Sequence, residues 1–173
     1  MYYMLIFLML ICGCGGRSKD ISIWIDERFD KDETLEIRKA ITDWNWALNG
    51  KVVIADEVGK IDLEKGFGEV WVVVKQKTED LDHDVDNKTL AYVRRSDNAI
   101  YLIRDRIQDD IAISFIVRHE MGHLLGIDHT NRYLMYPYFS WSWFKCVDQI
   151  TAGKIAKEWG FRIWELNYCN RED

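Results

Sequence analysis

The chain has 173 residues, of which 48% are apolar and 30% charged, and this is long enough for one domain with a packed core. The formal net charge is -6 and no basic stripe is present, which argues against a nucleic-acid partner. A single proline and the lack of low-complexity runs argue against disorder away from the chain ends.

The N-terminal segment differs in composition from everything that follows. Residues 1–12 are almost all apolar, but this run is shorter than the roughly 20 residues that a spanning helix needs. Because small residues follow it, we expect residues 1–16 to be a secretory signal. The letters ICGC at 11–14 also resemble a bacterial lipobox, with Cys14 as the lipidated residue. We therefore expect an exported protein, either secreted or a membrane-anchored lipoprotein; the alternative is a buried N-terminal strand or helix.

The first two predicted elements are a strand and a helix. Alternating, β-branched residues predict a strand at 21–25. A helix is predicted over 30–48, because Asp30 or Asp32 can cap it and apolar residues recur at helical spacing. The Asn49-Gly50 pair, which tolerates a left-handed conformation, is predicted to end this helix.

The remaining elements are mostly strands, followed by two helices. Strands are predicted at 51–55, 69–74, 90–93 and 99–103. The continuous apolar character of 69–74 suggests burial on both faces. Asp109 or Asp110 is predicted to cap a helix that reaches about Leu125, and a last helix covers 148–159. This order predicts one α+β domain over residues 17–173.

The most informative segment is HEMGHLLGIDH, residues 119–129, which holds three of the four histidines. Residues four apart on a helix share a face, so His119 and His123 can both reach one tetrahedral Zn²⁺. Gly126 can turn the chain sharply, and the turn can bring His129 back as a third ligand. Three protein ligands leave a fourth position for water, as in catalytic zinc sites.

Glu120, within the same motif, indicates the reaction that the site could catalyse. It neighbours His119 but is offset from the ligand pair, which suits a general base that acts on a metal-activated water. The alternative is a helix with incidental histidines. Every fixed position of HExxHxxGxxH is filled, and this joint spacing favours the zinc centre.

The motif resembles that of the metzincin zinc peptidases, which carry a methionine turn further along the chain. The turn candidate is Leu134-Met135-Tyr136-Pro137, and with His129-Thr130 it is most similar to the catalytic domain of the matrixins. The resemblance implies a twisted, mixed five-stranded sheet with an antiparallel edge strand, an active-site helix and a C-terminal helix. It also implies that Met135 lies beneath the metal without binding it.

The resemblance further implies that residues 90–93 are the edge strand that pairs with an extended protein or peptide substrate. We therefore predict a zinc metalloendopeptidase with one catalytic Zn²⁺. Two alternatives stay open. One is a catalytically silent, zinc-holding binding module, against which the intact Glu120 argues. The other is a zinc hydrolase of cell-wall peptides.

Some features depart from the matrixin pattern or allow two interpretations. The segment between His129 and Met135 looks short, so its turn must be tight. Residues 75–88 contain only His83, so the second, structural zinc site of the animal enzymes is not expected. Alternating carboxylates at 80–87 offer oxygen ligands for Ca²⁺, but they lack the glycine and glutamate of an EF-hand loop, which favours a solvated acidic loop.

Two further questions stay open at the level of the sequence. Cys146 and Cys169 either form a disulfide, which an exported protein would preserve, or remain thiols. The aromatic residues of 136–144 either line a substrate pocket or cover the final helix as core.

Overall fold

The computed structural model describes residues 19–62, 69–81, 85–138 and 146–169. The predicted signal with Cys14, the acidic residues around His83 and most of the aromatic stretch after Tyr138 lie outside the described residues. Within the described part, no helix combines the length and the apolar character that a membrane crossing needs.

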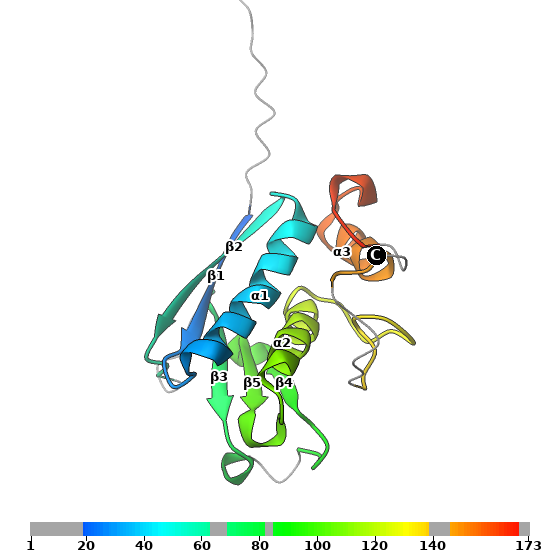
Figure 1. Ribbon diagram of the computed structural model, residues 1–173. Coiled ribbons are helices and arrows are strands. Elements are labelled where there is room, and N and C mark those ends of the chain that lie inside the picture. Colours follow the sequence, from blue (N-terminus) through cyan, green and yellow to red (C-terminus); the bar gives the residue numbers. More distant parts are fainter. Residues whose placement is uncertain (1–18, 63–68, 82–84, 139–145, 170–173) are drawn as a thin grey trace, which may run out of the picture.

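The centre of the fold is a five-stranded sheet (Figure 1). Its strands are β1 (Lys19–Asp26), β2 (Val52–Gly59), β3 (Trp71–Gln76), β4 (Ala91–Arg94) and β5 (Ala99–Ile103). They lie in the order β2-β1-β3-β5-β4, and only β4 runs antiparallel to its neighbour. The predicted mixed sheet with an antiparallel edge strand is thereby confirmed.

The helices are α1 (Lys31–Leu48), α2 (Asp110–Leu124) and α3 (Gln149–Trp159). Short 3-10 turns in the described residues are η2 (Thr78–Asp80), η3 (Arg95–Asp97), η4 (Arg104–Arg106) and η5 (Ile163–Glu165). The large core lies between α1, α2 and one face of the sheet, and α1 and α2 run side by side there (Figure 1). Val72 and Val74 of β3 belong to a second apolar cluster that does not include Val73, so β3 is buried on both faces as predicted.

Local polar groups determine where the helices begin and end. Asp30, rather than Asp32, caps α1, and with Glu33 it forms a reciprocal capping box. Asp109 caps α2 and Asp148 caps α3, each by accepting hydrogen bonds from backbone N–H groups of the first turn. Asn49 adopts a left-handed conformation with φ 49° and ends α1, as its sequence predicted.

The C-terminal segment is connected to the chain that follows α2. A disulfide joins Cys146 to Cys169, which resolves the question that the sequence left open. Next to it, the Cys169 N–H donates a 3.0 Å hydrogen bond to the Val147 carbonyl. The residues that precede α3 are therefore held against the end of the chain.

Candidate metal centre

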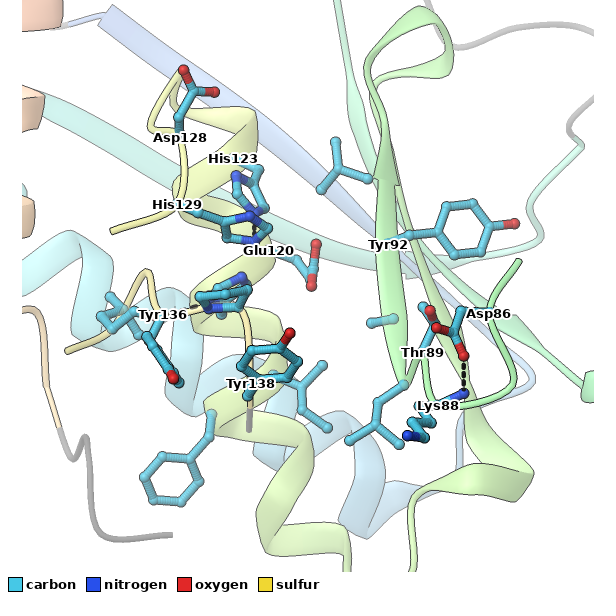
Figure 2. A pocket seen from close by; sticks show the side chains of 18 of the residues that line it. Asp86, Lys88, Thr89, Tyr92, Glu120, His123, Asp128, His129, Tyr136 and Tyr138 are labelled. Carbon is cyan, nitrogen blue, oxygen red and sulfur yellow. Dashed lines mark hydrogen bonds between the residues drawn. The ribbon is translucent and has the colours of Figure 1, made fainter. Parts of the chain in front are cut away.

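A cleft of about 850 Å³ lies between the edge strand β4 and helix α2 (Figure 2). Its lining comes from four parts of the chain: the segment before β4 (86 and 88–90), β4 itself, one side of α2, and the segment after α2. From this last segment, Tyr136 and Tyr138 contribute to the wall, so this part of the aromatic stretch does line a pocket. Arg95, which follows β4, forms an exposed ion pair with Asp128, in the loop that precedes His129. Arg95 Nη2 lies 3.6 Å from Asp128 Oδ1.

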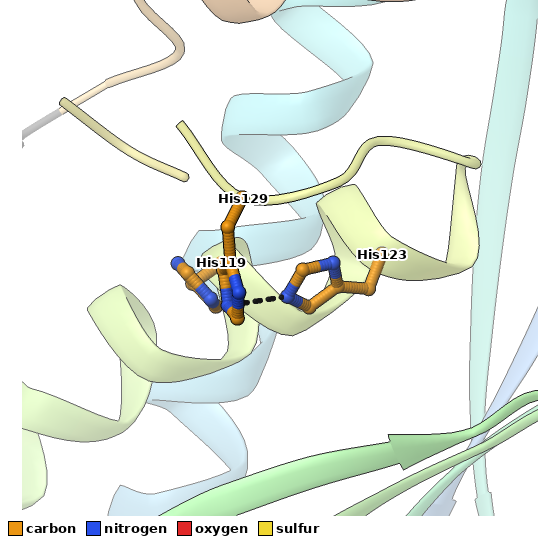
Figure 3. A group of neighbouring side chains, drawn as sticks. All are labelled: His119, His123 and His129. Carbon is orange, nitrogen blue, oxygen red and sulfur yellow. Dashed lines mark hydrogen bonds between the residues drawn. The ribbon is translucent and has the colours of Figure 1, made fainter. Parts of the chain in front are cut away.

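The three predicted histidines meet in this cleft (Figure 3). Each offers one ligand atom, and these atoms all lie within 4.8 Å of one another. His119 and His123 come from successive turns of α2, and their ring centroids are 4.9 Å apart. The Nε2 atoms of His123 and His129 are 3.1 Å apart, although six residues separate them in sequence. In the described residues, no other group of three or more metal-ligating side chains converges in this way.

Gly126 brings His129 into the group. Its φ is +90°, a left-handed conformation that glycine adopts at little cost. The Ile127 N–H then bonds the Gly122 carbonyl at 2.9 Å, which closes the C-terminal end of α2. The chain reverses at this point, as the motif predicted.

Backbone carbonyls orient two of the imidazoles. His119 Nδ1 lies 2.6 Å from the Leu134 carbonyl oxygen, and His123 Nδ1 lies 2.7 Å from that of Ile127. A carbonyl can only accept, so each Nδ1 carries the proton and Nε2 keeps a free lone pair. Metal-binding histidines are commonly oriented in this manner.

The methionine turn, Leu134-Met135-Tyr136-Pro137, is compact. Met135 is fully buried, and its carbonyl accepts a 2.7 Å hydrogen bond from the Thr130 N–H. Tyr133 adopts a left-handed φ of 67°, and its carbonyl accepts from Tyr136 N–H at 2.9 Å. The tight turn expected from the short segment after His129 is present.

Sequence reasoning missed Gly122, which lies between the two histidines of α2. A Cβ on Gly122 would lie only 2.4 Å from Met135 Sδ, so the thioether packs directly against the helix backbone. The sequence did contain a sign of this role. Glycine inside a helix costs about 1 kcal/mol relative to alanine, so its presence there usually has a packing reason.

Asp148 was also missed, since the sequence marked it only as a helix start. Its buried carboxylate accepts from the Leu134 N–H at 3.2 Å and from the Thr151 hydroxyl at 2.7 Å. Asp148, the cap of α3, thus also holds Leu134, and the Leu134 carbonyl orients His119.

Glu120 points from α2 into the cleft, between the histidines and β4 (Figure 2). Burial raises the pKa of its carboxyl group to about 8, because the charged form loses hydration. Burial also lowers the pKa of His119 to about 4, although the bond to Leu134 opposes this shift.

The residues present fit a divalent zinc ion. Neutral imidazoles with free Nε2 lone pairs are the form that binds Zn²⁺. A dication among them would also favour the charged form of the neighbouring carboxylate. The calcium expectation falls partly on residues 82–84, which lie outside the described residues, and it stays a prediction.

Comparison with known proteins agrees with this geometry. The family model of the matrixins, peptidase family M10, matches residues 24–150, which is more than half of the chain. The match extends from β1 through the histidine motif to the first turn of α3. A search of curated proteins finds no match. On the family match, the chain belongs to the matrixin family of peptidases.

Proposed function

We propose that this protein is a zinc-dependent metalloendopeptidase. One observation carries the proposal: three imidazoles converge in a cleft, two of them oriented by backbone carbonyls, next to a buried carboxylate. A purely structural zinc site has no need of that carboxylate or of an open cleft.

The roles of the site residues follow from their positions. His119, His123 and His129 would hold the ion. When bound, zinc supplies Lewis acidity that lowers the pKa of a water molecule and polarises the scissile carbonyl. Glu120 accepts the proton that this water loses and passes it to the nitrogen of the leaving amine.

The edge strand β4 supports an extended substrate. Among the strands that the structure describes it pairs with β5 alone, and residues of β4 line the cleft. A peptide that adds to this open edge would gain main-chain hydrogen bonds, and side-chain pockets would select its residues. Phe115 of α2 and Tyr136 offer an apolar wall for one such side chain.

The experiment compares the full chain with Glu120→Gln on a mixture of peptides of known sequence, read by mass spectrometry. Glu57→Gln, the same change on the exposed face of β2, is the matched control. We expect the parent and the control to cut. Glu120→Gln should bind one zinc ion but lose at least about 100-fold in rate, a typical contribution of a general base.

The outcomes separate the candidate functions. Cleavage by Glu120→Gln at the parent rate would contradict the role of Glu120. Zinc binding without cleavage in all three proteins would favour the silent binding module. A second assay on cross-linked cell-wall peptides completes the comparison, and cleavage of these alone would favour the cell-wall hydrolase.

We extend the proposal to export, with residues 1–16 as the signal and Cys14 as a lipid attachment site. The Cys146–Cys169 disulfide supports export, because oxidising compartments preserve disulfides. Cys14→Ser should move the protein from the membrane fraction to the soluble fraction of its cells. An unchanged distribution would argue against lipidation.

A further inference from the structure

The side chain of Trp44 contacts α2 where the zinc motif begins. Trp44 lies on α1 and is fully buried. Its indole Nε1–H donates a 2.9 Å hydrogen bond to the carbonyl of Arg118, the residue immediately before His119. Because α1 and α2 lie side by side (Figure 1), this bond connects the two helices at the turn that presents the first imidazole.

The six-membered ring of the same indole approaches Gly122, on the next turn of α2. A Cβ placed on Gly122 would lie 2.4 Å from Met135 Sδ, 2.9 Å from Met135 Cε and 3.6 Å from Trp44 Cζ2. The thioether and the indole therefore converge on the stretch of helix backbone between His119 and His123. Met135 follows Leu134, whose carbonyl orients His119. A displaced indole would disturb the helix turn that carries His119 and the helix backbone against which Met135 packs.

We propose that Trp44 is a positioning residue for the zinc centre. It fixes the turn of α2 that presents His119, and the adjoining backbone at Gly122 against which Met135 packs, and so the placement of His119 relative to the other two imidazoles. This inference rests on the proposed zinc function, and it adds a residue of α1 that lies far from the motif in sequence. A tryptophan that merely filled the core would affect folding stability and leave the metal site unchanged.

The test uses Trp44→Phe in the full chain, with Trp71→Phe as the matched control. The first change removes the N–H donor and shortens the ring next to Gly122. The second makes the same change on β3, within the same buried core. Zinc affinity is measured by competition with a chromophoric chelator, and the site geometry by the visible absorption of the Co²⁺-substituted protein. Thermal unfolding of the metal-free proteins measures how much each change destabilises the fold.

We expect Trp44→Phe to lower zinc affinity about 10- to 100-fold, the usual effect of losing contacts that orient metal ligands, and to alter the Co²⁺ spectrum. Trp71→Phe should lower the unfolding midpoint but leave both metal readouts unchanged. If Trp44→Phe fails to fold, Trp44→Tyr, which also lacks the indole N–H but fills more of the buried space, takes its place and should also lower zinc affinity.

Different results would contradict different parts of the proposal. Parental zinc affinity and an unchanged Co²⁺ spectrum in Trp44→Phe, or in Trp44→Tyr where only that variant folds, would overturn this inference alone. Equal losses of zinc affinity in Trp44→Phe and Trp71→Phe would also overturn it, because the effect would then follow from general core damage. A parent protein that holds no zinc would overturn the proposed function as well.

Discussion

At the scale of single residues, the zinc motif depends on the backbone conformation of Gly126. Its φ of +90° lies where L side chains are strained, and a Cβ there would meet Glu158 Cγ at 3.2 Å. The motif spacing therefore needs glycine for a conformational reason, independent of any metal chemistry. Without this turn, His129 could not return to the imidazoles of α2.

Gly126→Ala should lower the free energy of unfolding by about 1–2 kcal/mol, because the left-handed conformation costs an L residue about that much. Urea denaturation measures the change. Gly59→Ala is the matched control, since Gly59 has no positive φ and a Cβ there would meet nothing within 4 Å. A Gly126→Ala protein as stable as the parent would show that the turn tolerates a side chain.

At the scale of elements, one buried carboxylate connects α1 with the ends of two strands. Glu33 accepts from Lys75 of β3 at 2.6 Å, from the Asp30 N–H at 2.8 Å and from Arg104 in η4. Arg104 also pairs with Asp110 in the first turn of α2. Helix α1 and helix α2, which carries His119, Glu120 and His123, are thus held at their N-terminal ends by the same group of charges.

This network predicts how stability depends on pH. Burial by itself would raise the pKa of Glu33, but hydrogen bonds from Lys75, Asp30 and Arg104 hold this pKa below its ordinary value. A carboxyl group whose pKa is lower in the folded state than in the unfolded state stabilises the protein at pH values above the unfolded-state pKa. This contribution is lost as the pH falls through the folded-state pKa. Stability should therefore decline on acidification below the ordinary pKa of glutamate.

Glu33→Gln should cost about 3 kcal/mol at neutral pH, the lower end for breaking a buried ion pair. Lys75 and Arg104 keep some contact with solvent, which moderates the loss. Denaturant unfolding at several pH values measures both effects. The difference between parent and variant should shrink in acid; a difference that stays constant down to pH values where Glu33 is protonated would contradict this assignment.

At the scale of the whole molecule, the disulfide and Asp148 connect the segment after α3 to the histidine cluster. Cys146 and Cys169 are 23 residues apart, and they flank α3. Asp148, two residues after Cys146, holds the Leu134 N–H. The cross-link therefore restrains the segment that supports the methionine turn.

Replacing both cysteines by serine should lower the free energy of unfolding by about 3 kcal/mol, because a loop of this length gains that much entropy in the unfolded chain. Denaturant unfolding with and without a reductant measures the loss. The reductant should destabilise the parent and leave the double variant unchanged. Equal stability of the parent in both conditions would mean that the cross-link does not restrain the unfolded chain.

The limits of the strands show why sequence alone placed them only approximately. β2 was predicted at 51–55, but it extends to Gly59 because Glu57 and Val58 pair with Trp24 and Ile25 of β1. β3 was predicted at 69–74, but it begins at Trp71 and includes Lys75 and Gln76, which pair with β5. The polar residues Glu57, Lys75 and Gln76 carry little strand signal, and the partners of these strand ends lie far away in sequence.

The sequence by itself determined the features that depend on short spacing: the helix faces, the turn at Gly126, and the candidate ligands His119, His123 and His129. Such features need only helix geometry and the conformational freedom of one glycine. The tertiary structure alone decided the supports of the site. Trp44 reaches Arg118 across 74 residues, Asp148 reaches Leu134 across 14, and Gly122 is needed because Met135 packs against it. These contacts arise when separate elements pack into one core, and no local pattern in the sequence encodes which residues will then meet.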